Sequence, residues 1–380
     1  MSSTTPALQW QEHQQTQQRL WLHHANQAVP KRVQIVDDSL NADTAYRLAC
    51  EGTGLLWRGD FQNAKNLLQA IARRIDHKPK RTKKAPPTTD SALETFHKHR
   101  QQQAQRARVL NMLLIELDAN FHIPLRRAPD IQQACLEAYG EQDAAFVTSL
   151  RELLGIIGAH EWRKNGVFIA ALQAKIHPYY GIFSPVRGEY LELIAKAPLP
   201  STELAFDIGT GSGVIAAVLA KRGVKKIIAT DLEARALTCA AENADRLGVT
   251  SQIEFVQTDL FPQGRAPLIV CNPPWLPVRP NSIIENAIYD PDSRMLKGFL
   301  AGLKDHLEAE GEAWLIMSDL AEHLGLRSHE QLWSWIEQAG MKVAGKLDIR
   351  PQHKKAMDSS DSLHQARAAE VTSLWRLRHQ

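Results

Sequence analysis

The second half of the chain alternates short apolar runs with segments whose apolar residues recur every three to four positions. The short runs have the length of buried strands, and the segments between them have the spacing of helices. This alternation predicts a mostly parallel sheet with helices on both faces, joined by right-handed crossovers. The predicted strands are 204–208, 226–230, 253–257, 268–271, 313–317, 341–347 and 371–377, and the predicted helices are 211–221, 233–247, 293–307 and 330–339. The last two strands are joined by a polar loop, which favours an antiparallel pair at the sheet edge.

The first part of the chain has a different pattern. Residues 1–40 are polar and weakly patterned, which predicts a loosely structured N-terminal tail. Over 44–75 the apolar residues recur at helical spacing, with a glycine-containing interruption near 52–59. We therefore predict a mainly helical N-terminal domain over 41–175, followed by the α/β domain over 176–380.

A basic, proline-broken linker covers residues 78–90. It cannot be the interior of a helix, because proline lacks the N–H that the helix needs and clashes with the preceding turn. Ser91, with Glu94 three residues later, suits a capping box. This pattern predicts a long helix over 91–118.

Length and composition limit the class of protein. A chain of 380 residues is long enough for two domains, and 44% hydrophobic with 23% charged residues is ordinary for a globular protein. No apolar run approaches the roughly 18–20 residues that span a bilayer, and the N-terminus lacks the pattern of a secretory signal. We expect a cytoplasmic protein without membrane association. The four cysteines and fifteen histidines show no metal-ligand spacing, so no metal is predicted.

The net charge of +3 is unevenly distributed. Residues 1–175 hold 23 Lys and Arg against 17 Asp and Glu, a balance of +6, and residues 176–380 hold 22 against 25, a balance of −3. The segment 73–108 alone carries 11 Lys and Arg with three acids. It is either a contact with RNA phosphates or a solvated linker and helix face. Few aromatic residues interleave with these charges, which favours the second interpretation.

A glycine-rich turn follows the first predicted strand of the α/β domain. Asp207 ends that strand, and Gly209, Thr210, Gly211 and Gly213 come directly after it. Glycines permit a tight turn and close approach of a ligand to the backbone, and the next helix presents unpaired N–H groups. The spacing is GxGxG, unlike the GxGxxG of dinucleotide binders. The turn predicts a nucleoside cofactor site, with Asp207 either holding the turn or orienting a cationic ligand tail.

Two further carboxylates follow the next two strands. Asp231, with Leu232 beside it, ends the second strand, and Asp259 lies just beyond the third. In an open parallel sheet, ligands bind at the carboxyl ends of the strands. Asp231 is therefore placed to accept hydrogen bonds from ribose hydroxyls, and Asp259 to accept one from the adenine amine.

The fourth strand leads directly into Asn272, Pro273, Pro274 and Trp275. An amide or aryl-amine nitrogen is a poor nucleophile because its lone pair is delocalised. The Asn272 side-chain oxygen and the Pro273 carbonyl can accept both of its N–H groups and turn it toward tetrahedral geometry. Proline stiffens the turn, and Trp275 offers a flat surface for stacking. These four residues are the candidate catalytic residues, and Asn272 also borders the cofactor cleft.

Together these motifs resemble a class I S-adenosylmethionine-dependent methyltransferase over about 203–347. The resemblance implies a Rossmann-like seven-stranded sheet and S-adenosyl-L-methionine as cofactor, with Asp231 at the ribose and Asp259 near the adenine. Asn272–Trp275 resembles the Asn-Pro-Pro-aromatic motif of enzymes that methylate base amines or the glutamine amide. In this chain Trp275 stands where Tyr or Phe is usual.

The segment 177–190 precedes the first strand and resembles two groups of these enzymes. It is loosely similar to the lead-in of glutamine-amide methyltransferases that act on release factors and ribosomal protein. Its Gly181–Ser184 portion is closer to ribosomal-RNA guanine methyltransferases of the small-domain group. Phe183 is the candidate cofactor-facing aromatic, whereas Tyr179 and Tyr190 are as well suited to packing.

The function predicted from the sequence is N-methylation of a planar amide or amine nitrogen. The leading acceptor is a glutamine side chain of a translation protein, and the alternative is an exocyclic amine of an RNA base. A non-catalytic RNA- or ribosome-binding protein on the same fold is a further alternative, which the intact Asn272–Trp275 motif disfavours. A nicotinamide oxidoreductase is disfavoured by the glycine spacing.

Overall fold

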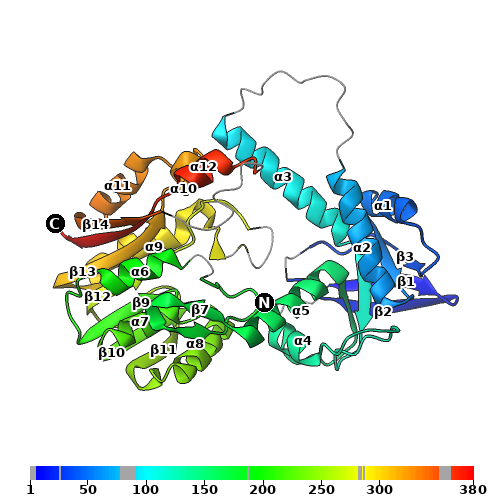
Figure 1. The fold of residues 1–380 in the computed structure, drawn as a ribbon, viewed down its shortest axis with the longest axis horizontal. Coiled ribbons are helices and arrows are strands. Elements are labelled where there is room, and N and C mark those ends of the chain that lie inside the picture. Colours follow the sequence, from blue (N-terminus) through cyan, green and yellow to red (C-terminus); the bar gives the residue numbers. More distant parts are fainter. Residues whose placement is uncertain are drawn as a thin grey trace. The chain divides into compact units, whose positions relative to one another are not determined.

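The computed structural model describes residues 6–24, 27–77, 91–185, 188–280, 285, 287–350 and 361–380. These residues form two compact units (Figure 1). The first unit contains the described residues up to 77 together with 97–161, and the second contains 91–96 together with 162–380. The second unit begins before the predicted boundary at 175, because the hairpin of β7 (Val167–Ile169) and β8 (Ala174–Ile176) packs into its core. The predicted linker over 78–90 lies outside the described residues.

A seven-stranded sheet forms the centre of the second unit, in the order β11-β10-β9-β12-β13-β15-β14. The strands from β11 to β13 pair in parallel, whereas β15 runs antiparallel to both of its neighbours. Each of the seven predicted strand segments lies in this sheet. The strands are β9 Leu204–Ile208, β10 Lys226–Asp231, β11 Ile253–Gln257, β12 Ala266–Cys271, β13 Leu307–Ser318, β14 Met341–Ile349 and β15 Thr372–His379.

Helices cover both faces of this sheet (Figure 1). Apolar side chains of α6, α7 and α8 pack on one face, and those of α9 and α11 pack on the other. Strand residues alternate between the two cores, so Val270 belongs to the first and Cys271 to the second. The helices are α6 Glu189–Lys196, α7 Val214–Lys221, α8 Ala234–Arg246, α9 Arg294–His306, α10 Leu320–His323, α11 His329–Gln338 and α12 His364–Ala369.

The composition of the central elements follows from their double burial. Strands β9 and β12 have helices on both sides, so their residues form nearly continuous apolar runs. Helix α7 reads Val-Ile-Ala-Ala-Val-Leu-Ala-Lys, and every residue before its last lysine is buried. A helix that is apolar on all sides must lie in the interior. The first βα connection of the sheet, which leads into α7, is therefore held on a rigid base.

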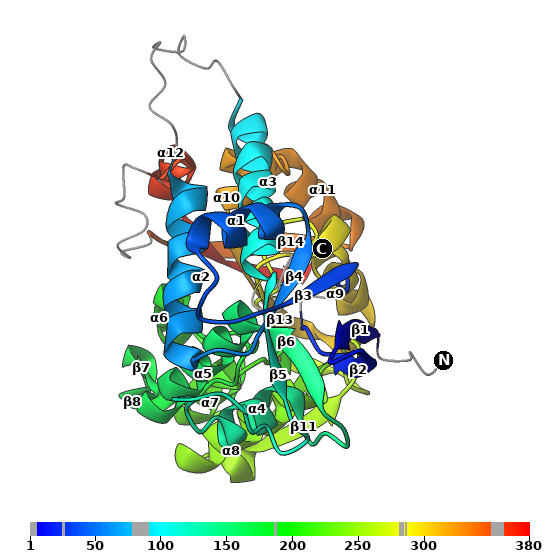
Figure 2. The ribbon, with the colours of Figure 1, turned by 90° about the vertical axis from the view of Figure 1, so that its right-hand side faces the viewer.

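The first unit is built on a six-stranded mixed sheet, in the order β1-β2-β6-β5-β4-β3 (Figure 2). β2 with β6, β5 with β4 and β4 with β3 pair in parallel, and the other two pairs are antiparallel. The strands are β1 Ala7–Glu12, β2 Gln15–Trp21, β3 Arg32–Val36, β4 Thr53–Trp57, β5 Leu113–Leu117 and β6 Phe146–Ser149. The helices are α1 Ala42–Cys50, α2 Phe61–Asp76 and α4 Gln132–Tyr139, together with most of α3 Ala92–Leu110 and of α5 Leu150–Asn165, which continue into the second unit.

This sheet was not predicted for the N-terminal region. More of the described residues over 41–175 lie in helices than in strands, but β4, β5 and β6 form the interior of a sheet, so the unit is not a helical domain. Their residues are buried on both sides and so lack the period-two alternation that distinguishes a strand from a helix. The long helix predicted over 91–118 accordingly ends at Leu110, and its apolar second half is β5.

Residues 1–40 are likewise not a loose tail in their described part, since they supply β1, β2 and β3. Leu8, Trp10 and Trp21 are buried in one apolar cluster with residues of the inner strands. In β1 the exposed Gln9 and Gln11 alternate with the buried Leu8 and Trp10, and β2 is mostly polar up to Trp21, which gave these strands a polar composition. None of the described helices has the length and apolar character needed to cross a membrane.

Candidate active site

The glycine turn lies at the carboxyl end of β9. Gly209, Gly211 and Gly213 have φ of 71°, 55° and 78°, in the left-handed region where a side chain is strained. A Cβ on Gly213 would also lie 2.9 Å from the Cβ of Ala240, and one on Gly209 would clash with the Met295 side chain. The predicted turn is therefore one that only glycine accommodates, and it leads into the N-terminus of α7.

Asp207 is fully buried beneath this turn. Its Oδ2 accepts hydrogen bonds from the Thr210 hydroxyl at 2.6 Å and the Ala216 backbone N–H at 3.1 Å. Burial raises the pKa of Asp207 to about 7, and these two hydrogen bonds only partly oppose that effect. Asp207 thus connects the strand end to the glycine turn and to the first turn of α7.

Asp231 lies at the end of β10 and contacts the same turn. Its Oδ2 accepts a hydrogen bond from the Gly211 N–H at 3.0 Å, and its Oδ1 accepts one from the Glu233 N–H at 3.0 Å. The Leu232 side chain, next to Asp231, is 60% exposed. Asp259, beyond β11, forms an ion pair with Arg294, and both side chains are exposed.

Phe183 lies on the other side of the turn. Its Cβ is 3.7 Å from the position that a Cβ on Gly211 would occupy, and its ring centroid is 6.4 Å from that of Tyr190. The Tyr179 hydroxyl donates a hydrogen bond to Glu242 at 2.5 Å, and its ring packs against Ile182, Ala236 and Cys239. The structure thus places Phe183 beside the glycine turn and gives Tyr179 a packing role.

The Asn-Pro-Pro-Trp turn is adjacent to the glycine turn. Cys271, the last residue of β12, pairs with Ile208, the last residue of β9. Asn272 and Gly209 therefore begin their turns side by side, on strands whose spacing is about 4.8 Å. The indole N–H of Trp275 donates a hydrogen bond of 3.0 Å to Asn272 Oδ1. The two candidate motifs, which are distant in sequence, border one site.

The start of α9 forms a further wall that sequence reasoning missed. Asp290 is buried and accepts hydrogen bonds from the Met295 and Leu296 N–H groups, which fixes the first turn of the helix. The Met295 side chain then reaches Gly209, and Arg294 reaches Asp259. The one available signal was an aspartate before a helix of apolar period. It gave no indication that the helix would face the glycine turn.

Three buried polar atoms near the turn have no hydrogen-bond partner among the described residues. They are Asp207 Oδ1, Ser212 Oγ and Tyr190 Oη. Burial, together with the charge of Asp207, raises the pKa of Tyr190 well above its usual range, and Asn272 opposes this effect only in part. An unpaired buried polar atom destabilises a protein by about 1–3 kcal/mol. Such a group of atoms beside a glycine cradle fits a polar ligand with a positively charged portion.

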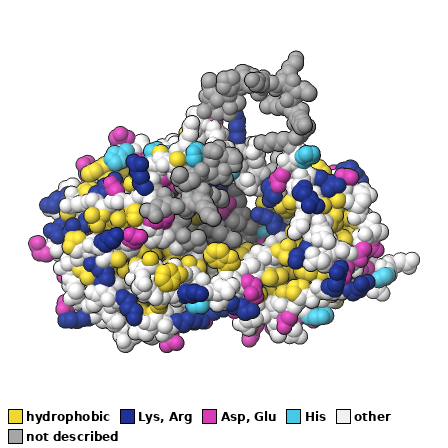
Figure 3. Space-filling view, viewed as in Figure 1, with side chains coloured by type: hydrophobic (Ala, Val, Ile, Leu, Met, Phe, Trp, Pro, Cys, Tyr) yellow, Lys and Arg dark blue, Asp and Glu magenta, His cyan; other side chains and the backbone are white. Residues whose placement is uncertain are grey.

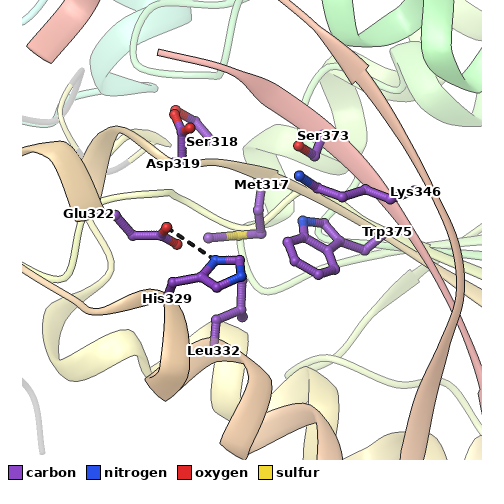
Figure 4. Close-up of a pocket in the computed structure, with 9 residues that line it drawn as sticks. All are labelled: Met317, Ser318, Asp319, Glu322, His329, Leu332, Lys346, Ser373 and Trp375. Atoms are coloured by element: carbon purple, nitrogen blue, oxygen red, sulfur yellow. Dashed lines mark ion pairs between the residues drawn. The ribbon is translucent and has the colours of Figure 1, made fainter. Parts of the chain in front are cut away.

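No group of three His, Cys, Asp or Glu side chains within the described ranges is arranged to hold a metal ion. A small pocket of about 80 Å³ lies beside the carboxyl end of β13 (Figure 4). Its charged groups are already paired within the protein, Glu322 with His329 at 3.3 Å and Lys346 with Asp348 at 3.1 Å. We assign no ligand to it. The lining residues are Met317, Ser318, Asp319, Glu322, His329, Leu332, Lys346, Ser373 and Trp375.

Comparison with known proteins gives the class to which this fold and site belong. The family described as Ribosomal protein L11 methyltransferase (PrmA) matches residues 190–273. A putative protein N5-glutamine methyltransferase of Methanocaldococcus jannaschii is 31% identical over 160 residues, which cover 40% of this chain and 79% of that protein. The chain therefore belongs to the family of S-adenosylmethionine-dependent methyltransferases that includes the M. jannaschii protein. It is an enzyme of this class, with S-adenosyl-L-methionine as its cofactor.

Two other relatives match over shorter stretches. A release factor glutamine methyltransferase of Cereibacter sphaeroides is 40% identical over 119 residues, which cover 30% of this chain and 41% of that protein. A tRNA1(Val) (adenine(37)-N6)-methyltransferase of Shewanella halifaxensis is 30% identical over 141 residues, which cover 35% and 57%. The named acceptors of these relatives include both protein and RNA. The matches thus support methyl transfer more firmly than any one acceptor.

Proposed function

We propose that this enzyme methylates a glutamine side-chain amide of a protein of the translation machinery. The observation that carries the proposal is the pairing of Cys271 with Ile208, which sets the Asn-Pro-Pro-Trp turn beside the glycine turn. The relatives named as protein N5-glutamine and release factor glutamine methyltransferases support the choice of acceptor.

The cofactor supplies an electrophilic methyl group on a positively charged sulfonium. We assign the cradle to the backbone of Gly209, Thr210, Gly211 and Gly213, with Phe183 and Leu232 as apolar walls. Asp207 Oδ1, which is unpaired, suits the ammonium group of the cofactor, directly or through water. The carboxylate of Asp231 suits the ribose hydroxyls, and that of Asp259 the adenine amine once Arg294 moves away.

Asn272 Oδ1 and the Pro273 carbonyl hold the acceptor nitrogen by accepting its two N–H groups. This contact would weaken conjugation with the acceptor carbonyl and leave the nitrogen lone pair available to take the methyl group that the bound cofactor would supply. Trp275 and Pro274 limit the movement of the acceptor, and such positioning supplies a large part of the rate. The nitrogen loses its extra proton to water after transfer, so no general base is required.

Replacing Asn272 tests this assignment. N272A removes the side-chain acceptor and is expected to lower kcat at least about 100-fold, because misplacement of the reacting group has effects of that size. N272D is the matched control, since it keeps an oxygen acceptor and should retain more activity than N272A. Calorimetry should give N272A a cofactor Kd close to that of the wild type. Unchanged turnover in N272A would contradict the assigned role.

An RNA base amine is the second candidate acceptor, favoured by the match to a tRNA adenine methyltransferase. Basic side chains of the first unit could contact its phosphates, although Arg74 and Arg106 of the segment 73–108 already pair with Asp43 and Asp76. In the space-filling view, basic side chains are interspersed with acidic and apolar ones (Figure 3). A protein acceptor therefore remains our proposal.

Labelled-methyl transfer into a lysate from a strain lacking the enzyme separates the two acceptors. Label that protease releases and ribonuclease does not, with N5-methylglutamine identified by mass spectrometry of the digest, supports the proposal. If ribonuclease releases the label, the acceptor is an RNA base and the proposal of a glutamine amide is wrong.

A further inference from the structure

The hydrogen bond between Trp275 and Asn272 distinguishes this chain from the Asn-Pro-Pro-aromatic pattern that it resembles. The donor is indole Nε1, the acceptor is Asn272 Oδ1, and the distance is 3.0 Å. Phenylalanine has no donor, and the tyrosine hydroxyl lies at the tip of its ring rather than on the ring edge. Tryptophan alone among the three residues can make this bond within the turn.

The indole ring is itself held in place. Trp275 packs against the apolar cores on both faces of the sheet. The next residue, Leu276, donates a backbone hydrogen bond to Ile288 O at 3.1 Å and accepts one from Asp290 N at 2.8 Å. The segment that carries the ring is therefore fixed to the segment that begins α9. A donor fixed in this way determines where its acceptor can lie.

An indole N–H can only donate, so it selects the oxygen of the Asn272 amide over the NH2 group. A carboxamide that rotated by 180° would turn its NH2 group toward the indole N–H, with two donors facing each other. The surroundings thus favour one of the two orientations of Asn272.

We propose that Trp275 is a positioning residue, whose indole N–H holds the Asn272 carboxamide with Oδ1 toward the acceptor nitrogen. This inference rests on the proposed function of Asn272. A carbonyl oxygen has two lone pairs, so one receives the indole N–H and the other remains for an acceptor N–H. The acceptor must then direct its second N–H to the Pro273 carbonyl. The bond orders the oxygen before the acceptor arrives.

The first test needs neither cofactor nor acceptor. In a 1H–15N spectrum of the protein labelled at its tryptophan indoles, W275F identifies the Trp275 signal by its loss. The hydrogen bond predicts that this signal shifts in N272A and that its N–H exchanges with water at least about tenfold faster, because the protected donor is released. N272D, which keeps an acceptor, should preserve the protection. A Trp275 signal unaffected by N272A would overturn the proposal.

The second test separates positioning from stacking. W275F keeps an aromatic face and loses the donor, and we expect kcat for methyl transfer into lysate to fall about tenfold, the effect of one net hydrogen bond. The KM for the cofactor should stay within about twofold, as positioning predicts. W333F is the matched control, since Trp333 also donates an indole hydrogen bond, to His329 at 2.6 Å, on a different part of the unit. Its kcat should equal that of the wild type.

The outcomes distinguish this inference from the proposed function. If N272A is inactive while W275F is fully active, the positioning role is wrong and the role of Asn272 stands. If N272A is active, the proposed function fails first, and the indole spectrum still decides whether the bond exists. If W275F does not fold, as shown by circular dichroism, W275Y replaces it with the same expected loss.

Discussion

Two buried carboxylates, one in each unit, illustrate how a structural acid differs from one in the proposed cofactor site. Glu152, on α5, accepts hydrogen bonds or ion pairs from His23 at 3.0 Å, His24 at 2.7 Å and Tyr139 at 3.0 Å. These donors lower the pKa of Glu152 to about 2 in spite of its burial. Asp207 has an unpaired oxygen, and burial raises its pKa to about 7.

The difference lies in what the protein supplies to each group. The Glu152 carboxylate is hydrogen-bonded by its neighbours, so its ionised form is stabilised in the folded unit. Asp207 has only a hydroxyl and one backbone N–H, and no cation stands beside it in the described residues. A buried charge without compensation destabilises a fold and persists where it serves a function. The comparison therefore points to the glycine turn as the place where a cation binds.

The largest expected effect is on Glu152. E152A leaves its buried partners without an acceptor and should lower the free energy of unfolding of the first unit by about 3–5 kcal/mol. Urea denaturation of the full chain, followed by a signal from the first unit, measures this decrease in the free energy of unfolding. E51A is the matched control, because the exposed Arg47–Glu51 pair contributes less than about 1 kcal/mol. If the two substitutions had equal effects, the hydrogen bonds to the buried Glu152 would not stabilise the unit as we infer.

The pH dependence of the same group has a definite sign. The folded pKa of about 2 lies below the ordinary value of 4.5, so the unfolded chain binds more protons between these values. The contribution of Glu152 is therefore complete above about pH 4.5 and disappears as the pH falls through 2. The wild type should lose stability over this range, and E152A should lose less.

Asp207 should show the opposite behaviour. Its folded pKa of about 7 lies above the ordinary 3.8, so its contribution to stability is complete below pH 3.8 and is lost as the pH rises through 7. D207N removes the charge while it keeps an oxygen for Thr210 and Ala216. It should stabilise the second unit at pH 8 by roughly 2–4 kcal/mol, since one pKa unit corresponds to about 1.4 kcal/mol. A less stable D207N would contradict the raised pKa.

The same substitution, D207N, should weaken binding of the cofactor. If the ionised Asp207 stabilises the ammonium group, the wild-type Kd should rise as the pH falls below about 7, up to about tenfold per unit, because the carboxyl must lose its proton first. Calorimetry across pH 5.5–8.5 measures this dependence. D207N should bind more weakly at pH 8 and show a flat profile over this range. A flat wild-type profile would argue that Asp207 only holds the turn.

The sequence predicts the helices and strands of the second unit well and those of the first unit poorly, and the reason is physical. In the second unit, strands and helices alternate, and glycines or prolines mark the ends of β9 and β12. In the first unit, β4 and β5 are apolar on both faces and adjoin helices, so their period is lost. The outer strands β1 and β2 are rich in glutamine, and only the spacing of Trp10 and Leu8 marks them.

The sequence predicted the two turns of the candidate site but not the side chains of α9 beside them. Glycines and prolines indicate a turn from local sequence alone, because the backbone conformation requires those residue types. Met295 and Arg294 have no such local requirement. Met295 faces the glycine turn and Arg294 faces Asp259 because β12 lies beside β9 and α9 follows β12, which is a property of the strand order. The bond from Trp275 to Asn272 was likewise invisible, since it depends on the rotamers of two side chains.

Asp231 should have a moderate effect on the cofactor. Its carboxylate accepts from the Gly211 N–H, so D231A loses both the proposed ribose contact and a constraint on the glycine turn. The cofactor should bind more weakly by roughly 1–3 kcal/mol, as for a charge-assisted hydrogen bond. D231N, which keeps one acceptor oxygen for the turn, should lose less. An unchanged dissociation constant in D231A, measured by calorimetry, would refute the assignment.

The smallest expected effect is that of replacing Arg294, and it tests whether Asp259 contacts the adenine amine. The two side chains form an ion pair, and they are 62% and 49% exposed, so the pair contributes less than about 1 kcal/mol. If Asp259 accepts from the adenine amine, this pair competes with the cofactor. R294A should then tighten the cofactor Kd by about two- to threefold, and salt should reduce the difference because it screens exposed pairs.

A matched control is available at the opposite end of the sheet. Lys226, at the start of β10, forms an exposed ion pair with Glu254 at 3.0 Å, so K226A removes a comparable pair away from the strand ends that carry the site. Its cofactor Kd should equal that of the wild type. If R294A instead binds the cofactor more weakly than K226A does, Arg294 itself contacts the ligand. Asp259 would then be the residue that orients this arginine, and the adenine amine would need another acceptor.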